Sequence, residues 1–128
     1  MILVAAGLIY RDGRLLIAQR LPGVHGALKW EFPGGKVEAD EDPRVCLVRE
    51  VREELGIGIR VEGIVETVYH RYAERSVLLL FYRCAWEEGE PRAIECADFA
   101  WADPSALSTF DFLEADCDFI RRLEQGRP

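Results

Sequence analysis

Residues 35–57 read GKVEADEDPRVCLVREVREELGI and place three carboxylates, Glu50, Glu53 and Glu54, in one short stretch. On an α-helix these positions are i, i+3 and i+4, so the three side chains share one face. Like charges at that spacing repel by roughly 0.2–0.5 kcal/mol per pair in an isolated helix. Keeping them together therefore favours a hard divalent cation such as Mg²⁺ between them.

The ends of this helix are marked by residues that commonly start and stop helices. Asp42 precedes Pro43, which fits an N-cap followed by the first helical position. Gly56 fits a C-terminal stop, because glycine adopts the left-handed conformation that ends many helices. Apolar residues at helical spacing are expected to face the core. They are Val45, Val48, Val51 and Leu55.

Segments with the composition of β-strands flank this helix. Residues 2–10 and 14–19 enclose Asp12 and Gly13, a dipeptide typical of two-residue hairpin turns. Residues 30–35 predict a short extended piece ending in two glycines, where the backbone can approach a ligand closely. The other expected elements are strands at 58–69, 76–86 and 99–101 and a helix at 115–123. This pattern predicts an α/β or α+β layered domain whose helices cover the sheet.

The bulk composition sets limits on domain number and partners. With 128 residues, 49% of them hydrophobic, the chain is expected to form one domain over residues 1–128. A net charge of −7 argues against a nucleic-acid polymer, which requires a basic surface. A small anionic substrate fits if metal ions screen the acids.

The sequence also carries no sign of a membrane span or a redox motif. Its apolar runs fall short of the roughly 20 residues that a membrane helix needs. No Cys-x-x-Cys pair occurs. We expect a cytoplasmic protein without an obligatory protein partner, whose cysteines pack as small hydrophobic residues. They are Cys46, Cys84, Cys96 and Cys117.

The opening stretch resembles the signature of the Nudix hydrolase family, G-x5-E-x7-R-E-U-x-E-E-x-G-U, where U is a bulky aliphatic residue. Its specified positions are Gly35, Glu41, Arg49, Glu50, Val51, Glu53, Glu54, Gly56 and Ile57. At an average usage near 7% per residue type, the seven fixed identities would arise by chance in roughly 10⁻⁶ of chains this long. The resemblance implies an α+β fold, an α/β/α sandwich in which helices flank a mixed central β-sheet.

The residues of this signature indicate hydrolysis of a phosphorus anhydride. Glu50, Glu53 and Glu54 can coordinate Mg²⁺, or Mn²⁺ as an alternative, that bridges a polyphosphate. Gly34 of the Gly-Gly turn can add a backbone carbonyl ligand, and one carboxylate can activate a water for attack on phosphorus.

Two further signature residues are expected to support the catalytic carboxylates. Arg49 can orient them through charge-assisted hydrogen bonds. Glu41 is expected to do the same or to join the metal ligands. The resemblance adds Glu95 as a loop carboxylate of the metal site, with Asp98 as its rival. The general base stays open among Glu41, Glu50, Glu53 and Glu95.

Nearly the whole chain is similar to the MutT branch of the family, nucleoside triphosphate pyrophosphohydrolases that include enzymes sanitising the pool of oxidised dGTP. This similarity implies that several residues outside the signature contact substrate. They are Arg20, Glu31, Phe32, Lys36, Arg75 and Asp116. For Arg20 and Arg75 the alternative is an ordinary surface charge, and for Phe32 a place in the core. The histidines and Tyr72 are expected at the surface, the rim or in the core.

Asp116 departs from the best-known members selective for 8-oxo-guanine, which carry Asn at this position. An amide both donates and accepts hydrogen bonds, whereas an ionised carboxylate only accepts. An ionised Asp suits the N1–H and amino edge of guanine or the amine of cytosine, and a protonated Asp can also donate to cytosine N3. CTP-like and modified cytosine substrates therefore stay open beside 8-oxo-dGTP, and a plain helix cap is the alternative role.

The leading hypothesis is a Mg²⁺-dependent hydrolase that converts a nucleoside triphosphate to a monophosphate and pyrophosphate. A hydrolase of dinucleoside polyphosphates or ADP-ribose is a less favoured alternative, because no proline lies between Ile57 and Glu90, where the ADP-ribose type carries one. The third hypothesis is a non-catalytic module that senses nucleotides. Such modules typically lose a signature glutamate, and this chain retains all of them.

Overall fold

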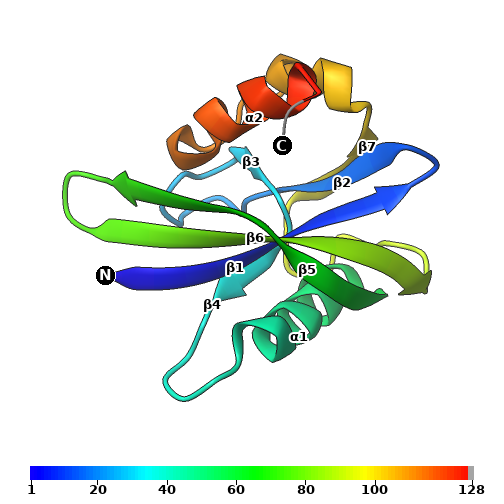
Figure 1. Ribbon diagram of the computed structural model, residues 1–128, viewed down its shortest axis with the longest axis horizontal. Coiled ribbons are helices and arrows are strands. Elements are labelled where there is room, and N and C mark those ends of the chain that lie inside the picture. Colours follow the sequence, from blue (N-terminus) through cyan, green and yellow to red (C-terminus); the bar gives the residue numbers. More distant parts are fainter. Residues whose placement is uncertain (127–128) are drawn as a thin grey trace.

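The computed structural model describes residues 1–126, so the last two residues of the expected 1–128 domain lie outside the described part. Figure 1 shows a twisted sheet with α1 (Pro43–Leu55) on one side and α2 (Cys117–Glu124) on the other. The expected mixed sheet flanked by helices, an α+β arrangement, is confirmed.

The sheet is built around β1 (Ile2–Arg11), which pairs antiparallel with β2 (Arg14–Gln19) and parallel with β6 (Ser76–Glu88). The strand order is β3-β2-β1-β6-β5, with β4 paired to β1 and β7 to β2. The remaining strands are β3 (Trp30–Glu31), β4 (Gly34–Lys36), β5 (Gly58–Arg71) and β7 (Asp98–Ala102). Two 3₁₀ helices, η1 (Pro104–Thr109) and η2 (Glu114–Asp116), precede α2.

The expected first hairpin forms as predicted. Asp12 and Gly13 have φ of 52° and 76°, and positive φ at both central residues is what the favoured two-residue hairpin turn requires. The second hairpin, β5–β6, runs longer than expected because β5 extends to Arg71 and β6 to Glu88. Its tip lies at the same end of the sheet as the start of β1, because Ile2 of β1 pairs with Val77 of β6, as Figure 1 shows.

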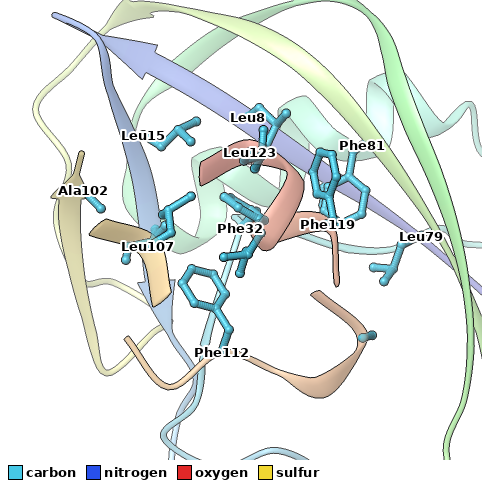
Figure 2. Close-up of a cluster of buried hydrophobic side chains, with 14 of the residues drawn as sticks. Leu8, Leu15, Phe32, Leu79, Phe81, Ala102, Leu107, Phe112, Phe119 and Leu123 are labelled. Atoms are coloured by element: carbon cyan, nitrogen blue, oxygen red, sulfur yellow. The ribbon is translucent and has the colours of Figure 1, made fainter. Parts of the chain in front are cut away.

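The core lies in two clusters, one on each face of the sheet, because side chains of a strand alternate between faces. From β1, Ala6 and Leu8 join the cluster under α2, while Ala5 and Ile9 join the cluster under α1. Figure 2 shows the first cluster, in which aromatic rings of the sheet and of α2 meet. Both faces of the central strand are therefore covered.

The caps of α1 agree with the sequence prediction. The Asp42 carboxylate accepts a hydrogen bond from the Arg44 amide at 2.8 Å. Gly56 has φ of 72° and its N–H donates to the Arg52 carbonyl at 2.9 Å. The helix therefore begins and ends at the expected residues.

The predicted inward face of α1 is partly wrong. Val45 is 60% exposed, whereas Leu47, Val51 and Leu55 are fully buried at i, i+4 and i+8. At 3.6 residues per turn, Val45 lies about 200° around the axis from Leu47, so both cannot face the sheet. Glu54, a charged residue, takes a place on the buried side of the helix.

The cysteines follow the expectation with one exception. Cys46, Cys84 and Cys96 are buried and free, whereas Cys117 is free but exposed at the start of α2. Packing of α2 explains the difference, because Phe119, Ile120 and Leu123 supply its buried face. None of the helices within residues 1–126 is both long and apolar enough to cross a membrane.

Candidate active site

The Gly34–Gly35 turn brings backbone directly against two signature carboxylates. The Gly34 N–H donates to Glu54 Oε1 at 3.0 Å. A Cβ at Gly35 would lie 2.4 Å from Cδ of Glu50, so only glycine leaves room for that carboxylate. The signature glycine and the signature acids are therefore in contact, although they come from β4 and α1.

Arg49 connects the other acids of the signature. Its Nε and Nη2 donate to the two oxygens of Glu41 at 3.0 and 3.1 Å. Its Nη1 lies 3.3 Å from Oε1 of Glu50 and 3.3 Å from Oε1 of Glu53. The expected charge-assisted hydrogen bonds are thus present, and those from Arg49 to Glu41 hold the pKa of that carboxyl below its usual range.

Burial, with a smaller contribution from neighbouring negative charges, raises the pKa of the acids nearest the turn. Burial, followed by the charge of Glu31, raises the pKa of Glu54 to about 8. Burial also raises the pKa of Glu50, against the opposing charge of Arg49. Repulsion of this kind is relieved by a divalent cation, so the chemistry of these donors fits such an ion.

The glutamate side chains of α1 lie on one side of the helix but do not converge on a common point. Across residues 1–126 no three acidic, histidine or cysteine side chains are close enough to form a preformed metal centre. Glu53 points toward Arg49, and the exposed Glu95 lies where its N–H donates to the Glu54 carbonyl at 3.1 Å. Its rival Asp98 accepts a hydrogen bond from the Phe99 amide.

The residues predicted to bind substrate come together around a cavity of about 290 Å³. Those that line it are Arg20, Glu31, Phe32, Lys36, Arg75 and Asp116. Gly34 and Gly35 line the same cavity, so it reaches the turn that contacts Glu50 and Glu54. The cavity thus extends to the turn beside Glu50 and Glu54, although no signature carboxylate is among the residues that line it within residues 1–126.

Phe32 contributes less to this cavity than the similarity implied. Its side chain is 3% exposed, and its ring lies 5.8 Å from Phe81, 5.4 Å from Phe112 and 6.3 Å from Phe119. Figure 2 shows it in the middle of this aromatic cluster. The ring therefore occupies a place in the core, which was the alternative role considered for Phe32.

The inner end of the cavity holds one buried acid, Asp116, together with the half-buried Glu31 and Arg20. Arg20 donates to Glu31 at 2.9 Å through Nη1 and to the His25 carbonyl at 2.7 Å through Nε. Burial raises the pKa of Glu31 despite this ion pair. Burial and the charge of Glu31 raise the pKa of Asp116 to about 8, against Arg20.

Asp116 is 3% exposed, and its carboxyl forms no hydrogen bond within residues 1–126. The interpretation of Asp116 as a plain helix cap is wrong, because its side chain makes no capping bond to α2. A buried polar group that lines a cavity without a partner is free to bind a ligand.

His25 and Tyr72 also line this cavity, although the sequence favoured no functional role for them. Tyr72 follows β5 at the tip of the hairpin that also carries Arg75, and His25 belongs to the loop after Arg20. The sequence signal that could have indicated His25 and Tyr72 is that they lie a few positions from Arg20 and Arg75.

Comparison with known proteins supports the resemblance noted in the sequence. Residues 1–123 match the NUDIX domain family. The chain is 39% identical to the CTP pyrophosphohydrolase of Escherichia coli K12, covering 100% of this chain and 97% of that protein. It is 36% identical to the 8-oxo-dGTP diphosphatase of Haemophilus influenzae, covering 94% and 89%. The solution structure of the E. coli ORF135 protein, 36% identical, superimposes with a TM-score of 0.82 over 100% of this chain and 94% of that one.

Proposed function

The chain belongs to the NUDIX family of hydrolases, which act on phosphorus anhydrides and generally use divalent metal ions, and we propose that it hydrolyses a nucleoside triphosphate to a monophosphate and pyrophosphate with Mg²⁺. Mn²⁺ is the proposed substitute. One observation carries the proposal: a single cavity joins Arg20, Glu31 and Asp116 to the glycine turn that touches the signature carboxylates. A nucleotide fits this arrangement with its base inside and its phosphates beside α1.

The residues proposed to hold the metal are the clustered donors of α1, β4 and the loop before β7. They are Glu50, Glu53, Glu54, Glu95 and the carbonyl of Gly34, with Glu41 as a further donor. When bound, the ion supplies neutralising charge for the phosphate oxygens.

The protein's own groups supply the remaining chemistry. Arg49 holds Glu41, Glu50 and Glu53 in place, which spares the site the cost of ordering them during the reaction. One of Glu41, Glu50, Glu53 and Glu95 accepts the proton of the water that attacks an interior phosphorus. Lys36 and Arg75 are the cations at the cavity available to contact phosphate oxygens.

The carboxyl of Asp116 is the group in the cavity that we propose binds the base. Burial favours the neutral carboxyl of Asp116, which offers one donor and one acceptor side by side. Such a pair complements a base with an adjacent acceptor and donor. Cytosine, oxidised guanine and the other common bases all carry such a pair, so the proposal of a cytosine or oxidised guanine base rests on the substrates named for the two relatives, CTP and 8-oxo-dGTP.

The reaction can be tested directly with a substrate panel. We would incubate the protein with Mg²⁺ or Mn²⁺ and canonical and oxidised nucleoside triphosphates, ADP-ribose and diadenosine polyphosphates in ¹⁸O-water, and identify products by phosphorus NMR. Monophosphate and pyrophosphate are the expected products, with ¹⁸O in one of them. Release of inorganic phosphate from triphosphates would refute the proposal.

The metal assignment has its own test in Glu53→Gln. This change keeps the shape of the side chain and removes its charge, so we expect turnover to fall at least ~10²-fold with the melting temperature nearly unchanged. Glu87→Gln, at an exposed carboxylate of β6, is the matched control and should retain full turnover. Unaltered activity of Glu53→Gln would show that the assignment is wrong.

A further inference from the structure

Tyr72 makes contacts with three separate segments of the chain. Its ring lies 4.7 Å from the ring of His25 and 4.5 Å from the ring of His70, both in edge-on geometry. Its hydroxyl oxygen accepts a hydrogen bond from the Ala115 N–H at 3.3 Å. One half-buried side chain thus joins the loop after β2, the end of β5 and the η2 segment.

These segments are walls of the substrate cavity. His25, Tyr72, Ala115 and Asp116 all line it. Ala115 is 6% exposed, so without the Tyr72 hydroxyl its N–H would have little access to water. The bond therefore fixes the backbone immediately before Asp116.

The carboxyl of Asp116 depends on that backbone for its position. The side chain makes no hydrogen bond of its own within residues 1–126, so only the charges of Arg20 and Glu31 act on it directly. The Tyr72 hydroxyl keeps its own proton at neutral pH, because burial raises its pKa further above 10. The Ala115 N–H thus meets a neutral hydroxyl at neutral pH.

We propose that Tyr72 is a positioning residue for base selectivity: its hydroxyl fixes Ala115, and its ring holds the His25 loop, so that Asp116 meets the base in one orientation. The proposal deepens the proposed function and rests on it. It assigns Tyr72 no part in the attack on phosphorus, so its loss changes discrimination between bases more than turnover.

The test uses Tyr72→Phe, which removes the hydroxyl and keeps the ring. The ratio of kcat/KM between the preferred and the least preferred base is expected to fall roughly 2- to 10-fold, the range of one neutral hydrogen bond. Turnover of the preferred substrate should stay within about 2-fold, since no group near phosphorus changes. Amide hydrogen exchange at Ala115, followed by NMR without substrate, should become faster.

Two further variants separate the ring from the hydroxyl and from general effects. Tyr72→Leu also removes both ring contacts, so KM is expected to rise for every base. Tyr69→Phe deletes the same atom from a tyrosine of β5 that is 59% exposed and should leave the ratio, KM and Ala115 exchange unchanged.

The possible outcomes separate the positioning role of Tyr72 from the proposed function. An unchanged selectivity ratio in Tyr72→Phe, an equal loss of turnover for all bases, or a wild-type protein without base preference overturns the role of Tyr72 alone. A wild-type protein that hydrolyses no nucleoside triphosphate refutes the proposed function and this inference with it.

Discussion

Gly34 and Gly35 are adjacent, yet the structure predicts opposite consequences for replacing each with alanine. A Cβ at Gly34 would lie 2.0 Å from the carbonyl oxygen of Ala5 in β1, and Gly34 has φ of 156°. A Cβ at Gly35 would meet the Glu50 side chain, 2.4 Å from Cδ and 2.6 Å from Oε2. The first clash is with backbone and the second with the far end of a flexible side chain.

The magnitudes follow from what has to move. In Gly34→Ala the β1–β4 pairing must open. We expect this to lower the free energy of unfolding by roughly 3 kcal/mol, the upper end of the range for overpacked substitutions. At about 4 °C per kcal/mol this lowers the melting temperature by about 12 °C. In Gly35→Ala the Glu50 side chain rotates away at a cost of about 1 kcal/mol. Displacing a carboxylate with the proposed catalytic role by about 1 Å can cost ~10²-fold in kcat/KM, so we expect activity to fall while the fold remains.

The assay compares three alanine variants in thermal unfolding and in pyrophosphate release from the preferred substrate. Gly63→Ala is the control, because a Cβ there meets nothing within 4 Å and Gly63 has no positive φ. We expect it to match the wild-type protein in both measurements. Full activity of Gly35→Ala would refute the proposed role of Glu50, and a wild-type melting temperature for Gly34→Ala would refute the close approach of β4 to β1.

Two further predictions concern pH and the core. The raised pKa of Asp116, about 8 against the usual 3.8, means that the folded protein binds more protons than the unfolded chain between about pH 4 and pH 8, so this group's contribution to stability declines as pH rises through that window. Asp116→Asn removes the titration, and its melting temperature relative to wild type should rise from pH 4 to pH 8; a constant difference would contradict the burial of a titrating carboxyl. Phe119→Ala empties a fully buried position 4.5 Å from the Phe81 ring and should cost about 3–5 kcal/mol in denaturant unfolding. Val45→Ala, at an exposed residue of α1, should lower the free energy of unfolding by no more than about 0.5 kcal/mol. A much larger decrease would mean that Val45 faces the core, as the sequence predicted.

The features that the sequence predicted correctly are local ones. The caps of α1 depend on Asp42, Pro43 and Gly56, and the first hairpin on Asp12 and Gly13, so neighbouring residues suffice to define them. The sheet and its flanking helices followed from the alternation of strand and helix patterns, together with the family resemblance.

What the sequence did not predict depends on contacts between distant segments. The rotation of α1 that exposes Val45 is set by packing against the sheet, which helical spacing alone cannot choose. Tyr72 and Ala115 are 43 positions apart, and only the fold brings them together. The burial of Asp116 likewise arises from a cavity whose walls come from β1, β4, β6 and the loops around them.

The acids of the site fall into two groups whose electrostatics differ, and this division bears on how a chain of net charge −7 would bind the proposed triphosphate. At the inner end, Glu31 and Asp116 have raised pKa values through burial, and Arg20 offsets what charge remains, so a neutral base meets little net charge. Beside α1, Arg49 stabilises the ionised form of Glu41, whose pKa is lowered, and this one arginine faces three carboxylates.

The positive charge available at the cavity is small. Arg20 is already paired with Glu31, which leaves Lys36 and Arg75 as the cations at the cavity without a side-chain ion pair in residues 1–126. Two exposed cations cannot balance both the proposed triphosphate and the acids of α1, so the proposed binding mode calls for the additional positive charge of a metal ion at that end.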